Sequence, residues 1–140
     1  MGIRSFFRFL RPVVGIDNQA ARDRWLEDTL LSIPANSRIL DAGAGTQQYR
    51  RFSKHLNYVS QDFSQYNGQG DGAALQTKEF DYGKLDIISD IASIPEPDSS
   101  FDAIMCIEVL EHVPDPLLAL REFSRLLRGG GHTNLDSAVL

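Results

Sequence analysis

Short apolar runs alternate with helical or irregular stretches along the 140 residues of this chain. Four runs are apolar on both faces, and we expect them to form strands: residues 38–40, 57–60, 85–89 and 101–107. Runs of this kind are typical of parallel strands that helices cover on both sides. Right-handed crossovers then give an open, mostly parallel sheet in a three-layer α/β/α sandwich.

Three segments around these strands favour helices. Asp17 can cap a helix that ends before Pro34, and residues 46–55 are a short helix candidate. Asp115 can cap a third helix with Pro116 in its first turn, stopped by the glycines at 129–131. The predicted buried faces are Ala21, Trp25, Leu26, Thr29, Leu30 and Ile33 in the first helix, and Leu117, Leu120, Phe123 or Ser124, and Leu127 in the third.

Composition narrows the class of protein. The chain is 42% apolar and 24% charged with a net charge of -5, which describes one globular domain. An acidic balance without a run of lysine and arginine argues against a nucleic-acid surface, so a small-molecule partner is expected. The single cysteine, Cys106, lies in an apolar run and is interpreted as a core residue, which excludes a disulfide framework and predicts a cytoplasmic setting.

The N-terminal stretch MGIRSFFRFLRPVV interleaves arginines with aromatic residues. The arginines break the apolar core that a signal peptide needs, and no other apolar run is long enough to span a bilayer. We interpret the stretch as a flexible arm or a cover over the ligand site. The alternative is a basic amphipathic segment in peripheral contact with a membrane.

Polar residues stand where each predicted strand ends. The first strand ends at Asp41 with Gly43 and Gly45 behind it, and the second ends at Asp62, 17 residues after Gly45. The third ends at Asp90 and Ile91, and the fourth ends in IEVLEH at 107–112. Because ligands of open α/β sheets bind beyond the carboxyl ends of the strands, these residues are the candidate site.

The acid before the Gly-x-Gly decides between two kinds of ligand. A dinucleotide site needs a third glycine, where this chain has Gln48, and a phosphate would be repelled by Asp41. An acid beside the glycines suits a cationic ligand such as S-adenosylmethionine, whose ammonium Asp41 can orient.

ILDAGAGT at 39–46, YVSQDFS around Asp62, the stretch 89–116 and LREFSRLLRGGG at 120–131 together resemble the class I S-adenosylmethionine-dependent methyltransferases of the methyltransferase domain 11 type. The resemblance implies a Rossmann-like fold, with the methionine end of the cofactor at the glycines, its ribose at Asp62 and its adenine beside Asp90 and Ile91. The common form has glycine in place of Gln47. The implied cofactor-binding residues are Asp41, Ala42, Gly43, Gly45, Asp62, Phe63, Asp90, Ile91, Ile107 and Glu108.

The sulfonium of this cofactor already activates its methyl group, so positioning of an acceptor is the protein's main task. His112 is the candidate catalytic base, and its alternative role is to orient the turn after the fourth strand. Glu108, Glu111 and His112 have the E-x-x-E-H form of some metal-dependent methyltransferases. The same letters occur in members without a metal, so we expect no metal and an activity that survives chelation.

The expected organisation is an arm and helix over 1–36 and a methyltransferase domain over 37–140 that lacks its last strands. Full members of the family have seven strands, whereas HTNLDSAVL at 132–140 offers at most a poor fifth. We expect four or five strands, weak or no turnover, and an exposed sheet edge that invites self-association. The acceptor is expected to be a small O or N nucleophile. A non-catalytic remnant of the fold and a nicotinamide-dependent oxidoreductase are the alternatives.

Overall fold

The computed structural model describes residues 19–64, 83–129 and 138–139, and every structural statement below concerns these residues. The predicted arm, the Asp17 cap and most of the C-terminal tail lie outside them.

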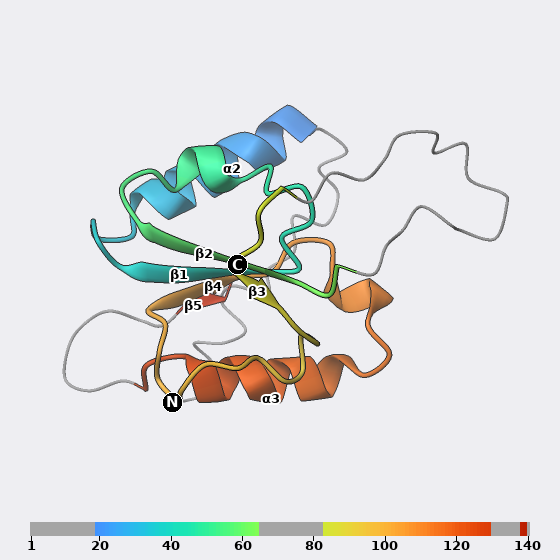
Figure 1. Cartoon of the computed structure of the whole chain (residues 1–140). Helices are drawn as coiled ribbons and strands as arrows, with labels where there is room; N and C mark the ends of the chain where they lie inside the picture. Colours follow the sequence, from blue (N-terminus) through green and yellow to red (C-terminus); the bar gives the residue numbers. More distant parts are fainter. Residues whose placement is uncertain (1–18, 65–82, 130–137, 140) are drawn as a thin grey trace, which may run out of the picture.

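Five parallel strands form one sheet in the order β3-β2-β1-β4-β5 (Figure 1). The central strand β1 (Arg38–Ala42) pairs with β2 (Asn57–Asp62) on one side and with β4 (Ala103–Met105) on the other. The two-residue strands β3 (Ile87–Ile88) and β5 (Ala138–Val139) form the edges. Helices α2 (Gln19–Leu31) and α3 (Pro116–Leu126) cover opposite faces of the sheet. The predicted parallel α/β/α sandwich is confirmed.

The β1 strand is buried on both faces, as its apolar pattern predicts. Ile39 packs toward α2 with Leu26 and Leu30, whereas Leu40 packs toward α3 with Phe123. The predicted inclusion of Trp25 in the buried face of α2 is wrong, because this side chain is 39% exposed.

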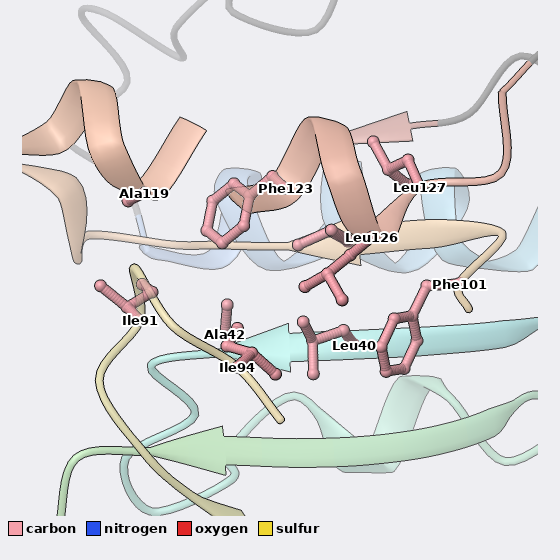
Figure 2. Close-up of a cluster of buried hydrophobic side chains, with 10 residues drawn as sticks. Leu40, Ala42, Ile91, Ile94, Phe101, Ala119, Phe123, Leu126 and Leu127 are labelled. Atoms are coloured by element: carbon pink, nitrogen blue, oxygen red, sulfur yellow. The ribbon is translucent and has the colours of Figure 1, made fainter. Parts of the chain in front are cut away.

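The α3 helix begins as predicted, with the Asp115 side chain accepting backbone N–H groups of Leu117 and Leu118 at 3.0 and 3.3 Å. Its buried face differs from the prediction, because Leu117 is 64% exposed. Figure 2 shows the observed face, which meets Ile91 and Ile94 across the core. It consists of Ala119, Phe123 and Leu126, continued by Leu127.

The predicted helix over 46–55 is also wrong. This segment forms turns and one short 3-10 helix, η1 (Arg50–Phe52). Gly45 and Gln47 have φ of 53° and 58°, the left-handed conformation, which interrupts a right-handed helix. Gln47 therefore adopts the conformation that a glycine at this place would adopt at no steric cost.

Candidate functional site

A pocket of about 480 Å³ opens beyond the carboxyl ends of the strands, within the size range of small-molecule sites. One wall follows β2 and the segment after β3, and the other follows the segment between β4 and α3. The described residues that line it include four carboxylates and neither lysine nor arginine. They are Gly43, Gln61, Asp62, Phe63, Asp90, Ile91, Ala92, Glu108, Val109, His112, Val113, Pro114, Asp115 and Leu118.

The glycine turn after β1 is held by the end of β2. The Gln61 side chain accepts the Gly43 N–H at 3.2 Å, and the Gln61 carbonyl accepts the Ala44 N–H at 2.9 Å. Asp62 Oδ2 accepts the Gly45 N–H at 2.8 Å. Three consecutive amides of the turn are thus fixed by two neighbouring residues of one strand.

Gly43 is required by packing as well as by its φ of 71°. A Cβ at this position would lie 2.6 and 2.7 Å from the two methyl groups of Val109. No side chain fits in that gap, so the missing Cβ lets the turn after β1 approach the segment after β4.

Asp62 both holds the glycine turn and lines the pocket. Its Oδ2 accepts from Gly45 and its Oδ1 accepts the Ser64 N–H at 3.0 Å, while the residue lines the pocket. Since an ionised carboxylate accepts about four hydrogen bonds, both oxygens retain capacity for ligand hydroxyls.

Asp41 lies behind the turn, 3% exposed and outside the pocket lining. The Tyr58 hydroxyl donates a hydrogen bond to its Oδ2. Burial raises the pKa of Asp41 from 3.8 to about 6; the Tyr58 hydrogen bond lowers it and the Asp62 charge raises it further. The carboxylate therefore carries its charge at neutral pH against a desolvation cost, which a nearby cation would offset.

The stability of the protein should fall as Asp41 ionises. Because its folded pKa of about 6 exceeds its ordinary 3.8, Asp41 stabilises the fold below pH 4, and this contribution disappears as pH rises through 6. The Asp41→Asn variant should be more stable than the parent at pH 7, by up to about 3 kcal/mol, with a flatter profile between pH 4 and 6. Urea unfolding at pH 4, 5, 6 and 7 measures this. Parallel profiles for the two proteins would contradict a raised pKa.

Asp90, Ile91 and Ala92 form part of the first wall. The Asp90 carboxylate accepts the Ala92 N–H at 2.8 Å, which closes a tight turn. The Ile91 side chain is buried in the core below this turn, and Ile94 packs in the same core against α3.

The second wall begins with Glu108, which has a left-handed φ of 57°. Such a conformation is uncommon for a side chain of this size and is concentrated at functional sites. The Arg22 guanidinium of α2 donates to the Glu108 carboxylate, and its Nη2 donates to Gln19 at 2.8 Å. A cation from the opposite helix thus reaches the rim of an otherwise acidic pocket.

His112 ends the short 3-10 helix η2 (Leu110–His112) and lines the pocket with a side chain that is 76% exposed. Its Nε2 lies 3.4 Å from a Glu111 carboxylate oxygen. Within the described part of the chain, no three histidine, cysteine, aspartate or glutamate side chains gather as a metal ion would require.

The methyltransferase domain family model matches residues 40–135, more than half of the chain, with its first matched residue in β1. The chain belongs to the methyltransferase domain family. A ubiquinone biosynthesis O-methyltransferase from Xanthomonas oryzae pv. oryzae is 45% identical over 59 residues, which cover 42% of this chain and 23% of that protein.

Two solved structures are similar over 81% of the chain. YcgJ of Bacillus subtilis is 25% identical with a TM-score of 0.60, and 48% of it is covered. The [4+2]-cyclase SpnF is 31% identical with a TM-score of 0.58, and 43% of it is covered. The chain therefore spans less than half the length of these relatives.

Seven predicted site residues line the pocket of this methyltransferase domain: Gly43, Asp62, Phe63, Asp90, Ile91, Glu108 and His112. Asp41, Ala42, Gly45 and Ile107 lie outside the lining. Asp41 and Ala42 are buried, and the Gly45 N–H donates a hydrogen bond to Asp62, which does line the pocket.

Sequence reasoning missed three contributors. Gln61 is 1% exposed, and besides Gly43 it contacts Ser89, donating to its carbonyl at 2.7 Å. Its position directly before Asp62, at the end of a predicted strand, was the available signal. Val109 and Arg22 gave no such signal, because their roles depend on contacts with Gly43 and Glu108, 66 and 86 residues away.

Cys106 is partly buried beside the core, and burial followed by the charge of Asp41 raises its pKa to about 12. Its thiol stays protonated at neutral pH and is no nucleophile. None of the described helices is long and apolar enough to cross a membrane.

Proposed function

We propose that this chain binds S-adenosylmethionine and supports transfer of its methyl group to a small-molecule hydroxyl. The observation that carries the proposal is the pocket itself: a glycine turn tied to Asp62, with four lining carboxylates and no lysine or arginine in the described lining. A pyrophosphate would be repelled there, whereas a sulfonium and an ammonium would be attracted.

The residues fit the cofactor group by group. Asp62 offers free carboxylate lone pairs to the ribose hydroxyls, and the wall at Asp90 and Ile91 offers a polar edge and an apolar surface to the adenine. The methionine end belongs at Gly43, with the charge of Asp41 behind the turn. Arg22, which already pairs with Glu108, supplies a cation for the cofactor's carboxylate.

The bound cofactor supplies a methyl group activated by a positive sulfur. The protein's residues exclude water and align the acceptor oxygen with the S–CH3 bond. The oxygen forms the new bond to carbon, the electron pair of the broken bond stays on sulfur, and His112 accepts the hydroxyl proton. A hydroxyl acceptor is supported by the O-methyltransferase names of the curated relatives.

The test uses S-adenosylmethionine labelled in its methyl group with two panels of acceptors, small aromatic alcohols and primary amines. Label on the alcohols supports the proposal, whereas label confined to the amines would overturn the hydroxyl acceptor. If the acceptors are still labelled after EDTA treatment of the protein, the transfer needs no metal ion. A second candidate is cofactor binding without methyl transfer, since one matching structure is named as a cyclase and not as a methyltransferase. Labelled cofactor that stays on the chain while neither panel takes up label would support this candidate.

His112→Gln should lower kcat roughly 100-fold, because general-base catalysis contributes about that factor or more. The dissociation constant for S-adenosylhomocysteine should stay unchanged, since the exposed His112 ring lies beside Glu111 and holds none of the residues proposed to bind the cofactor. Glu111→Gln, which removes only the neighbouring charge, is the matched control. An unchanged kcat in His112→Gln would assign His112 to orienting the turn instead.

A further inference from the structure

We infer that Glu122 and Arg125 on α3 are positioning residues that hold the adenine-facing wall of the pocket, which sets cofactor affinity. The inference rests on the proposed function for the identity of the ligand. Neither residue lines the pocket, so neither contacts the ligand.

The wall at Asp90–Ala92 is anchored at both ends. Before it, Ser89 donates its N–H to the Asp62 carbonyl at 3.1 Å and accepts from Gln61 at 2.7 Å. The bond from the Ala92 N–H to Asp90 lies within the wall itself and ties it to no other element.

The second anchor comes from α3. Glu122 accepts the Ile94 N–H at 2.8 Å, and Arg125 donates to the Ile94 and Glu96 carbonyls at 3.0 and 2.8 Å. Arg125 also donates to Asp98 at 2.8 Å. One guanidinium therefore satisfies three groups of a segment that has no regular secondary structure.

The two side chains hold each other in place. Arg125 donates from Nε and Nη2 to the two Glu122 oxygens at 2.9 and 2.6 Å, a bidentate pair. The Glu122 side chain is 11% exposed, and the Arg125 hydrogen bond, followed by the Ile94 amide, lowers its pKa against the effect of burial. The pair is thus a fixed fork rather than a mobile surface contact.

The same helix sets the facing wall. Leu118 in its first turn lines the pocket, and Asp115 caps it from within the lining. Because Glu122 and Arg125 lie one and two turns further along α3, the fork fixes the distance between the two walls. Losing it should widen the pocket at Ile91 while the core contacts of Ile94 keep the fold.

The test measures dissociation constants by calorimetry for S-adenosylhomocysteine and for methylthioadenosine, which lacks the amino-acid group. Arg125→Gln should weaken both ligands by the same factor, roughly tenfold, the equivalent of one good contact. Arg125→Lys keeps the charge but not the fork and should fall between. Arg128→Gln is the matched control, since it removes bonds to Asp102 and Ser99 at the far end of α3.

The measurements are made at a temperature at which circular dichroism shows each variant folded. If Arg125→Gln does not fold, the affinity of Arg125→Lys is compared with that of the parent instead. Unchanged affinity in a folded Arg125 variant would overturn the inference. An equal loss in Arg128→Gln, or a loss confined to S-adenosylhomocysteine, would also overturn it. Absence of binding by the parent chain would instead reject the proposed function.

Discussion

Gly43→Ala is expected to lower the free energy of unfolding by about 3 kcal/mol and to abolish measurable cofactor binding. The added Cβ would lie 2.6 Å from a methyl carbon of Val109. Overpacking of this kind typically costs about 1–3 kcal/mol. The left-handed backbone adds roughly 1–2 kcal/mol for any residue with a Cβ. Urea unfolding and calorimetry measure the two effects.

Two further variants separate the causes. Gly83→Ala has a similar φ of 60° but only an ordinary contact at 3.5 Å, so it measures the backbone cost alone. Val109→Ala combined with Gly43→Ala should restore about 1 kcal/mol or more relative to the sum of the single variants. Strict additivity would show that the overlap with Val109 does not cause the loss.

Asp62→Ala should weaken binding of S-adenosylhomocysteine by about 100-fold or more. The variant removes charge-assisted hydrogen bonds to the ribose, each worth roughly 1.5–3 kcal/mol. It also leaves the Gly45 and Ser64 N–H groups without their carboxylate acceptor, which loosens the turn that the cofactor contacts.

Asp62→Asn distinguishes charge from geometry, because its amide oxygen still accepts one backbone N–H. We expect an intermediate affinity and nearly parental stability for this variant. If Asp62→Ala bound S-adenosylhomocysteine as tightly as the parent, Asp62 would have only its structural role in the turn.

The elements that were predictable from the sequence are those with a local cause. The strand predicted at 57–60 forms as part of β2, and α3 starts where Asp115 and Pro116 provide a cap and a first turn. The Asp62 and Asp90 positions followed because the ends of parallel strands meet at one edge of a sheet. These features can be inferred from residues close together in the sequence and from the spacing of apolar positions.

The features that the sequence could not supply depend on distant partners. Leu117 fits a helical stripe, yet α3 turns Ala119 and Phe123 to the core because the opposing residues are Ile91 and Ile94. The turns at 46–49 replace a helix because Gly45 and Gln47 adopt left-handed φ values of 53° and 58°, in a turn whose Gly45 N–H is bound by Asp62, 17 residues away. The surroundings of the buried Asp41 carboxylate likewise depend on Tyr58 of β2, whose hydroxyl donates a hydrogen bond to it from 17 residues away.

Calorimetric titration of the chain with S-adenosylhomocysteine and, separately, with NAD tests the central claim most directly. The acidic pocket and the glycine turn tied to Asp62 predict that S-adenosylhomocysteine binds and that NAD, with its pyrophosphate, does not. Tighter binding of NAD than of S-adenosylhomocysteine would contradict the account.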